Sequence, residues 1–520
     1  MHDVGGRNLG DIIVRNTRYN FLLKIWEIVA VLLLTPYILS HIGIERYGIW
    51  AIVTVVTGYF GLLDLGIGSA YVKYISECYT NKDYNGLNGI VNTGFSFYLV
   101  LSVVISLLAF FSIHPLVSIL KIPAGMEKEA SFVIIGGISL FGLSGAISVF
   151  SAIQAGLQRM DVSVKISLLS SVINVLGIIF VLGKGMGLIG LMLNNIFVFI
   201  IAGIINVIAA YKLLPSLVFA PFVRMKWDVF IKLLRFGYRM QIVRLSELVV
   251  FQTDRLLIAV FFGVRAVGIY QIGVTLVNYA RQLPLFLIPA VLPAASEIST
   301  RKDAAKLAEL YLRGSKYLFV IAAPIMALLI SLANLIVNLW VGNGYETSAA
   351  IARLLAIGYV VNVTAGMAFT VGMGIGLTKM LSRSAAITMI INLILSILLL
   401  KLIGFYGVAI ATSVALIIGP VYLYFELHKH FNISIRELLR SVVYKPLLAS
   451  VVAGLSAYCM QISFLATQMP GKGELLVRFL SCGAVFLFVY MTGIVVLKCL
   501  DEYDFNLIRK QFTFPRQVGR

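Results

Sequence analysis

Fourteen apolar runs, each long enough to cross a lipid bilayer, constrain the fold of this chain more than any other feature. A transmembrane helix needs about 20 mostly apolar residues, whereas a strand of a membrane barrel needs about ten with strict alternation. The runs are too long for such strands, so the sequence predicts an all-α polytopic membrane protein with about 14 transmembrane helices. The predicted spans are 21–41, 47–68, 91–113, 131–157, 164–183, 186–210, 236–262, 267–295, 317–341, 350–377, 385–403, 406–426, 446–466 and 475–498.

The composition excludes a soluble enzyme. Charged residues make up 12% of the 520 residues and apolar residues 60%, whereas a soluble domain carries roughly 25% charged residues. So little polar surface cannot cover a water-soluble fold of this length. The sequence has no Walker-type glycine loop and no set of nucleophile, acid and base. We therefore expect no enzymatic activity, no cofactor and no metal site.

The distribution of positive charge predicts the orientation. Of the 42 Lys and Arg residues, 29 fall at or beyond one set of span ends and 8 at the other. The positive-inside rule places the first set, and with it both termini, in the cytoplasm. We expect a multi-pass protein of the cytoplasmic (inner) cell membrane. The net charge of +19 then reflects topology and contact with membrane lipids, not nucleic acid.

The chain contains an internal repeat of about 220 residues. Shifting the sequence by 220 aligns residues 41–83 with 261–303 without a gap, and 13 of the 43 positions are identical. Spans 1–6 and 7–12 therefore form two parallel six-helix repeats, an arrangement of transporters that bind substrate between repeats. The identical pairs include Gly43/Gly263, Gly48/Gly268, Tyr59/Tyr279, Ser76/Ser296, Glu77/Glu297, Lys82/Lys302 and Asp83/Asp303.

The repeat predicts the domain organisation. Residues 1–210 form an N-terminal six-helix lobe, and 211–235 form a cytoplasmic linker between the lobes. Residues 236–430 form a C-terminal six-helix lobe, and 431–520 hold two extra transmembrane helices and a cytoplasmic tail.

The predicted span 236–262 is the richest in polar residues. A charge at mid-bilayer costs about 2.5–3.5 kcal/mol on insertion scales, so it needs a cavity or a partner. At 100° per residue, five polar residues fall within about 140° of one helix face. They either line the cavity between the repeats and contact the substrate there, or they neutralise one another. In the second case Arg244 pairs with Glu247, and Asp254 with Arg255 or Arg281. The five residues are Gln241, Arg244, Glu247, Asp254 and Arg255.

Three further features belong to the predicted site. Arg281 lies midway along span 267–295 and is the best single candidate for phosphate contact, because a guanidinium donates two parallel hydrogen bonds. Glu27 lies deep in the first span and could face the cavity, whereas Asp64 lies near a cytoplasmic span end and carries less weight. Each proline removes a backbone donor, so kinks that act as a gate or hinge are predicted at Pro284, Pro289 and Pro293.

Three stretches resemble a known family. They are the turn at 36–50 with Gly43-Ile44-Glu45-Arg46-Tyr47-Gly48, the run 62–77 from Leu62-Leu63-Asp64-Leu65-Gly66, and Thr253-Asp254-Arg255-Leu256 followed by Gly268-Ile269-Tyr270. With the span pattern, they make the chain similar to the oligosaccharide-lipid (Wzx-type, O-antigen or polysaccharide) flippases of the MATE-like exporter superfamily, relatives of the lipid II flippases. The similarity covers residues 10–430.

The resemblance implies two V-shaped six-helix lobes around a cavity, with the extra two spans as in the lipid II branch. It implies that the chain flips a polyprenyl-pyrophosphate-linked oligosaccharide across the cytoplasmic membrane by alternating access. H⁺ or Na⁺ is a candidate coupling ion, and a polysaccharide polymerase and glycosyltransferases are candidate partners. Two alternatives remain: a MATE-type multidrug or cation antiporter that uses Glu247 and Asp254 as its carboxylates, and a membrane glycan ligase or transferase.

Overall fold

The computed structural model describes residues 9–64, 67–237, 241–463 and 471–504, and every regular element in these ranges is helical. The first eight and last sixteen residues, and so the predicted cytoplasmic position of the two chain ends, lie outside the described residues. An all-helical fold suits a bilayer, because a helix satisfies its own backbone hydrogen bonds where no water is present.

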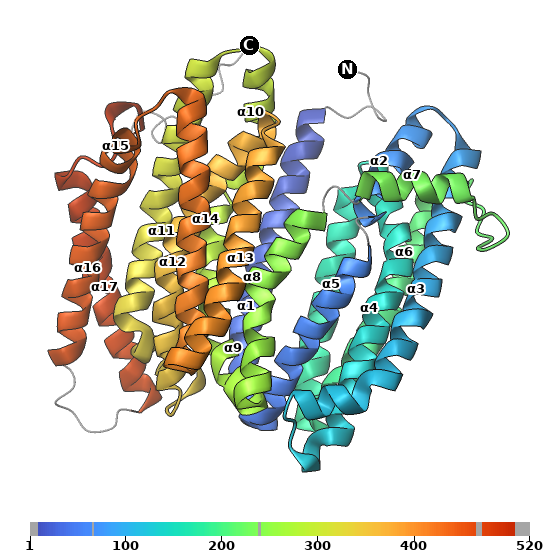
Figure 1. The fold of residues 1–520 in the computed structure, drawn as a ribbon, viewed down its shortest axis with the longest axis horizontal. Coiled ribbons are helices and arrows are strands. Elements are labelled where there is room, and N and C mark those ends of the chain that lie inside the picture. Colours follow the sequence, from blue (N-terminus) through green and yellow to red (C-terminus); the bar gives the residue numbers. More distant parts are fainter. Residues whose placement is uncertain (1–8, 65–66, 238–240, 464–470, 505–520) are drawn as a thin grey trace, which may run out of the picture. The chain divides into compact units, whose positions relative to one another are not determined.

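The described chain forms two compact units that divide between Gln271 and Ile272. The lobe boundaries expected from the repeat stay a prediction. Figure 1 shows the helices in sequence colours. Unit 1 contains α1 (Leu9–Phe60), η1 (Gly61–Asp64), α2 (Ile67–Thr80), α3 (Tyr84–Ile119), η2 (Ala124–Met126), α4 (Glu127–Gly156), α5 (Met160–Gly183), α6 (Gly187–Leu213), α7 (Trp227–Gly237), α8 (Gln241–Phe262) and the start of α9 (Val264–Leu285).

Unit 2 contains the rest of α9 and the elements that follow it. Helix α11 packs against α12, α16 and α17, so the two C-terminal helices of the chain dock on α11. The elements are η4 (Ile288–Ala290), α10 (Val291–Thr300), α11 (Ala304–Val341), α12 (Glu346–Gly374), α13 (Thr378–Ile403), α14 (Phe405–Phe431), α15 (Ile435–Leu438), a π-helical turn η5 (Leu439–Val443), α16 (Tyr444–Ser463) and α17 (Lys472–Val496).

Eleven helices of the described chain are long and apolar enough to cross a membrane, fewer than the fourteen spans expected. The first two expected spans appear as the single helix α1, which kinks at Gly43 where the backbone is non-helical. Helices α8 and α9 occupy the seventh and eighth expected spans but are not among the eleven. Charged side chains on both helices, such as Glu247 and Arg281, lower their mean hydropathy.

Repeat-related positions share backbone geometry. Gly43 and Gly263 both adopt a left-handed conformation, with φ of 77° and 80°, and each separates two helical segments. Glycine is suited to this conformation because it has no Cβ to clash. Asp83 and Asp303 both cap the helix that follows, their carboxylates accepting a backbone N–H three residues on at 2.8 and 2.9 Å. Each cap satisfies one of the free donors at a helix start.

A second repeat-related glycine pair makes a reciprocal close contact within unit 1. A Cβ on Gly48 of α1 would lie 1.9 Å from the carbonyl oxygen of Val264, and one on Gly268 of α9 would lie 2.5 Å from that of Ile44. Both values are below any real contact, so the two backbones approach only because neither position carries a side chain.

The linker between α6 and α7 is held on α3 by asparagine side chains. Asn88 donates to the carbonyl of Ser216 at 3.1 Å and accepts from the N–H of Val218 at 2.9 Å. Asn92 donates to the carbonyl of Val218 at 2.8 Å and accepts from the N–H of Ala220 at 2.7 Å. A connection without its own ladder needs such partners for its backbone groups, so α3 holds this segment in place.

A proline in α11 leaves a backbone carbonyl free to bind a side chain of α17. Pro324 has no N–H, so the carbonyl of Val320, four residues earlier, lacks its helical donor. The hydroxyl of Tyr490 on α17 donates to this carbonyl at 2.5 Å. The carbonyl that Pro324 leaves without a helical donor is therefore satisfied by α17, which packs on α11 at this point.

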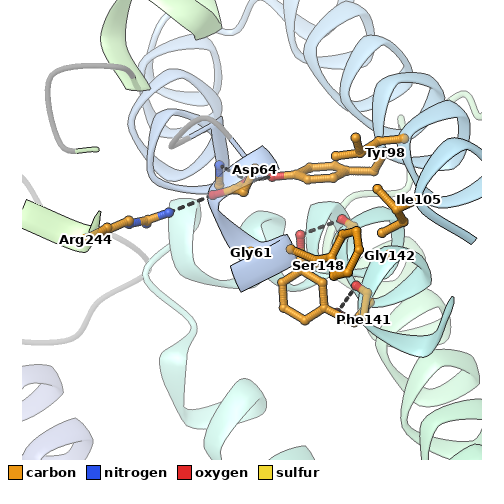
Figure 2. A pocket seen from close by; sticks show the side chains of 13 residues that line it. Gly61, Asp64, Tyr98, Ile105, Phe141, Gly142, Ser148 and Arg244 are labelled. Carbon is orange, nitrogen blue, oxygen red and sulfur yellow. Dashed lines mark hydrogen bonds and ion pairs between the residues drawn. The ribbon is translucent and has the colours of Figure 1, made fainter. Parts of the chain in front are cut away.

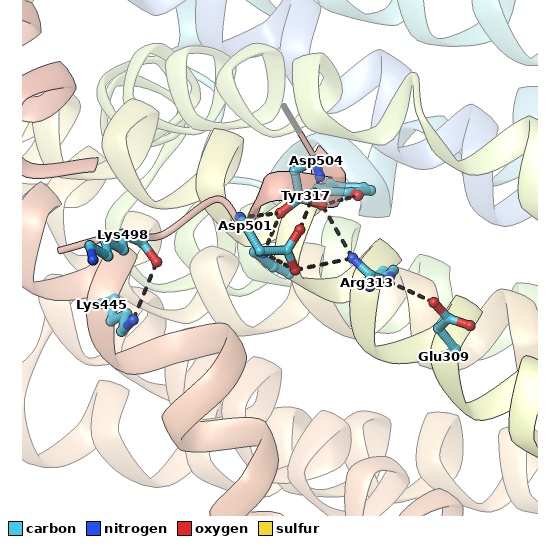
Figure 3. A network of polar contacts seen from close by, with 8 residues as sticks. Glu309, Arg313, Tyr317, Lys445, Lys498, Asp501 and Asp504 are labelled. Carbon is cyan, nitrogen blue, oxygen red and sulfur yellow. Dashed lines mark hydrogen bonds and ion pairs between the residues drawn. The ribbon is translucent and has the colours of Figure 1, made fainter. Parts of the chain in front are cut away.

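A carboxylate network ties the segment after α17 to α11 (Figure 3). Asp504, of which only 1% is exposed, accepts from Lys316 and Tyr317 at 2.5 Å each and from Arg313 at 3.4 Å. Burial alone would raise the pKa of Asp504, but the hydrogen bonds from Lys316 and Tyr317 outweigh it and lower the pKa to about 2. Asp501, which is 51% exposed, pairs with Arg313 at 3.2 Å.

The glycine contact predicts that Gly48→Ala lowers the stability of the detergent-solubilised protein by about 1–3 kcal/mol, because the added methyl group forces α1 and α9 apart. Gly483→Ala in α17 is the matched control, since its new Cβ meets nothing within 4 Å. Thermal unfolding of both variants measures the difference. Equal midpoints for the two variants would contradict the close approach.

The network predicts that Asp504→Ala costs about 3 kcal/mol, because it removes the nearer partner of Lys316 at 2.5 Å and leaves only Asp501 at 3.7 Å, whereas Asp501→Ala costs less. A carboxyl group with a lowered folded-state pKa stabilises the fold above its unfolded value of about 3.9. The contribution of Asp504 should therefore be complete above about pH 4 and be lost as the pH falls towards 2. Thermal unfolding between pH 2 and 7 tests this, and a wild type and an Asp504→Ala variant that differ equally at every pH would refute it.

Candidate functional site

Unit 1 encloses a cavity of about 240 Å³ with one charged wall (Figure 2). Small residues of α4 make the space: Gly142, Gly145 and Ser148 face the cavity from successive turns. The ring of Tyr98 packs over Gly145, where a Cβ would lie 2.5 Å from it. The full lining is Phe60, Gly61, Asp64, Gly68, Tyr98, Leu101, Ile105, Phe141, Gly142, Ser144, Gly145, Ser148 and Arg244.

An ion pair between Asp64 and Arg244 forms the charged wall. Asp64 ends the turn η1 that follows α1, and its Oδ2 accepts from Nη1 of Arg244 on α8 at 2.7 Å. Its other oxygen accepts from the hydroxyl of Tyr98 and from the N–H of Gly68 at 3.3 Å. Three donors therefore hold one carboxylate, as a charge inside an apolar environment requires.

Arg244 remains partly open. Its side chain is 41% exposed, against 17% for Asp64. A guanidinium has five N–H donors, and Asp64 takes one at Nη1. The carboxylate thus fixes the position of the cation, while the exposed part can still donate to an anion in the cavity.

Arg244 does not pair with the residue named in the ion-pair alternative. The sequence offered Glu247, three residues on along the same helix, but Arg244 pairs with Asp64, 180 residues away in sequence, and Glu247 is exposed. Asp64 also accepts a hydrogen bond from Tyr98 of α3.

Asp254 and Arg255 of α8 are buried. The carboxylate of Asp254 accepts from the hydroxyl of Tyr270 at 2.6 Å. Arg255 donates to Gln252, one turn earlier. Gln241 begins α8, but its side chain lies outside the described residues. Among the members of this set whose side chains are described, Arg244 is the one that lines the cavity.

Glu27 forms a local ion pair. It lies on α1 and accepts from Lys24 at 2.6 Å, an i,i+3 pair in which both side chains are substantially exposed. It does not line the cavity of unit 1.

Arg281 lies in unit 2 and stacks on an aromatic ring. Its guanidinium carbon is 5.2 Å from the ring centroid of Tyr359 on α12, within range of a cation–π contact. The hydroxyl of Tyr359 donates to Asn278, one turn before Arg281 on α9. The arginine is half-buried at this ring.

The three prolines break the expected span 267–295. Pro284 is buried in the last turn of α9, which ends at Leu285. Pro289 lies in the short 3₁₀ turn η4, and Pro293 lies in the first turn of α10. The result is three separate helical segments, α9, η4 and α10, instead of one kinked helix, because each proline lacks the N–H that would continue the backbone ladder.

Among the cavity residues, Asp64 was undervalued in the sequence prediction, and Tyr98, Gly142, Gly145 and Ser148 were not predicted. A signal for Asp64 existed, since it is an isolated acid in an apolar stretch. Nothing in the sequence distinguishes Tyr98 from the other 23 tyrosines.

These features define a class: a multi-pass, all-helical membrane protein with a transporter-type fold. The structure resembles lipid II flippase MurJ in an inward closed conformation, with a TM-score of 0.66 and 18% identity over 95% of this chain and 100% of that one. It also resembles an inward-facing multidrug resistance MATE family transporter of the MOP superfamily, with a TM-score of 0.62 and 16% identity over 80% and 94% of the two chains.

Sequence comparison gives the family. Residues 42–350, more than half of the chain, match the model of the family described as polysaccharide biosynthesis protein, and the chain belongs to that family. It is 23% identical to the "Putative O-antigen transporter" of Shigella flexneri over 74% of this chain and 91% of that protein. It is 22% identical to the membrane protein EpsK of Bacillus subtilis over 92% and 94%. The family is one of transporters and not of enzymes.

The ion pair predicts that substitutions of Asp64 and Arg244 are energetically coupled. Asp64→Asn and Arg244→Gln each leave the other charge without its partner, so their effects on stability should not add. A double-mutant cycle measured by thermal unfolding is expected to show a coupling of about 1 kcal/mol or more. Asp64→Asn combined with Arg265→Gln, at an exposed arginine at the start of α9, serves as the control. Additive effects in both cycles would mean that the ion pair does not contribute.

Proposed function

We propose that the chain flips a polyprenyl-pyrophosphate-linked oligosaccharide from the inner to the outer leaflet of the cytoplasmic membrane by alternating access. The observation that carries this proposal is Arg244, a partly exposed guanidinium fixed by Asp64 at the wall of a cavity. A pyrophosphate needs such a preoriented cation, because a fork of N–H donors matches its oxygens. The similarity to the Shigella flexneri protein supports a lipid-linked glycan as the substrate.

The size of the cavity limits what it holds. Its volume of about 240 Å³ is below the roughly 300–1,000 Å³ typical of pockets for drug-sized ligands. We propose that this cavity takes the pyrophosphate and the first sugar at most, and that Arg281 contacts the same substrate at another stage. The remaining expected residues then form polar surface along the path of the substrate or contacts between helices. They are Gln241, Glu247, Asp254, Arg255 and Glu27.

We further propose fourteen membrane crossings with both termini in the cytoplasm. Helix α1 contributes two crossings on either side of Gly43, α8 and α9 contribute one each, and the other ten spanning helices contribute the rest. The shared geometry of Gly43 with Gly263 and of Asp83 with Asp303 supports two parallel six-helix repeats plus two C-terminal helices. The broken helix around Pro284 and Pro289 is a natural place for the gate between conformations.

A cation-coupled antiporter is the second candidate. Asp254 is a buried carboxylate in α8, hydrogen-bonded to Tyr270, and a membrane carboxylate of this kind can carry a proton. In the flippase proposal an H⁺ or Na⁺ gradient drives the glycan lipid, and in the antiporter it drives a soluble drug. The two functions differ in cargo and are separated by a transport assay.

The function predicts the behaviour of two arginine variants in liposomes. With a labelled polyprenyl-pyrophosphate oligosaccharide, the wild type should expose substrate in both leaflets. Arg244→Ala should reduce the rate about tenfold or more, because a hydrogen bond to a charged group contributes about 1.5–3 kcal/mol, and Arg281→Ala should also reduce it. Arg265→Ala removes an exposed arginine outside the cavity and should leave the rate unchanged. Drug–proton exchange without lipid transfer would refute the flippase and favour the antiporter.

A further inference from the structure

A second pocket lies within unit 2, where α16 of the C-terminal helix pair packs against α11. It has a volume of about 460 Å³ and is formed by α11, α12 and α16. Its wall combines one cation, one phenol, one hydroxyl and two amides with aliphatic side chains. The lining residues are Ile330, Ser331, Asn334, Arg353, Gly454, Leu455, Tyr458, Gln461 and Ile462.

Arg353 is the only charged residue of this lining. Its Nε donates to the carbonyl of Ile330 at 3.1 Å. That carbonyl lies beside Leu332, where the backbone of α11 departs from helical geometry. Within the described part of the chain, the contact of Arg353 is to this backbone carbonyl and not to a carboxylate.

Two amide oxygens in the pocket lack donors. Oδ1 of Asn334 and Oε1 of Gln461 are buried, and neither accepts a hydrogen bond within the described part of the chain. An orphaned buried acceptor costs about 1–3 kcal/mol, so a ligand with hydroxyl or amine donors would recover that energy. The pocket thus offers a cation and unfilled acceptors side by side.

The pocket lies at a depth that suits a lipid headgroup. Asn334 is seven residues from the end of α11, Arg353 is seven residues from the start of α12, and Gln461 is two residues from the end of α16. At 1.5 Å per residue these distances are about 10 Å or less. Next to the pocket, α16 exposes Val451 and Leu455, an apolar surface along which acyl chains can lie.

A glycine brings the walls together. A Cβ on Gly454 of α16 would lie 2.6 Å from the hydroxyl oxygen of Ser331 on α11. The absent side chain lets α16 approach α11 closely at the base of the pocket. The pocket therefore depends on the C-terminal helix pair, which has no counterpart in the internal repeat.

We propose that this pocket binds the headgroup of an anionic phospholipid that carries free hydroxyl groups, such as phosphatidylglycerol. Arg353 takes the phosphate, and the oxygens of Asn334 and Gln461 accept hydrogen bonds from the headgroup hydroxyls. The site anchors the C-terminal helix pair to membrane lipid and does not depend on the identity of the transported substrate.

Native mass spectrometry of the purified full-length protein, with added phosphatidylglycerol, phosphatidic acid or phosphatidylcholine, tests the proposal. The wild type should bind phosphatidylglycerol best, phosphatidic acid less well because it lacks the glycerol hydroxyls, and phosphatidylcholine least. Arg353→Ala should lower phosphatidylglycerol binding about tenfold. Lys401→Ala, which removes an exposed cation at the end of α13, should leave it unchanged.

A second variant tests the acceptors and guards against misfolding of the first. Asn334→Leu should abolish the preference for phosphatidylglycerol over phosphatidic acid while retaining binding of both. Equal binding of all three lipids to the wild type, or equal losses in Arg353→Ala and Lys401→Ala, would overturn the proposal. Two competitors distinguish other sources of phosphate: full displacement by free glycerol phosphate, or stronger binding of polyprenyl phosphate, would contradict a phospholipid site.

Discussion

A charge inside a bilayer must find a partner, and in unit 1 this constraint is met by the ion pair between Asp64 and Arg244. The pair joins the turn after α1 to α8, and Tyr98 of α3 adds a third element to the same carboxylate. Three segments distant in sequence are thus held around one acidic group. The cavity beside this pair exists because α4 presents glycine and serine on this face. Arg244 stays at the cavity wall because breaking its ion pair with Asp64 would leave an unpaired charge.

The features predictable from the sequence are those with a local physical cause. Apolar runs indicate membrane helices because their length matches the bilayer. The repeat aligned Gly43 with Gly263 and Asp83 with Asp303, and both pairs have matching backbone conformations or caps. A left-handed glycine and an N-cap aspartate are decided within a few residues of chain, so the sequence alone carries the signal.

The site was only partly predictable, because its contacts are tertiary. Helical spacing placed Arg244 on the polar face of α8 and offered Glu247, on the same helix, as its partner only in the ion-pair alternative, whereas the partner is Asp64. Helical spacing reports which residues share a face and not what that face meets. The pocket around Arg353 was equally hidden, since three helices assemble it and the approach of two of them depends on Gly454.

Photo-cross-linking tests the central claim most directly: that Arg244 holds the lipid pyrophosphate in the cavity of unit 1. A polyprenyl-pyrophosphate oligosaccharide with its photoreactive group on the first sugar would be bound to the protein in membranes and the labelled peptides sequenced. The account predicts label on α8 around Arg244 and on α4 around Gly145 and Ser148, the residues that line this cavity. Efficient labelling confined to peptides outside the cavity lining would contradict it.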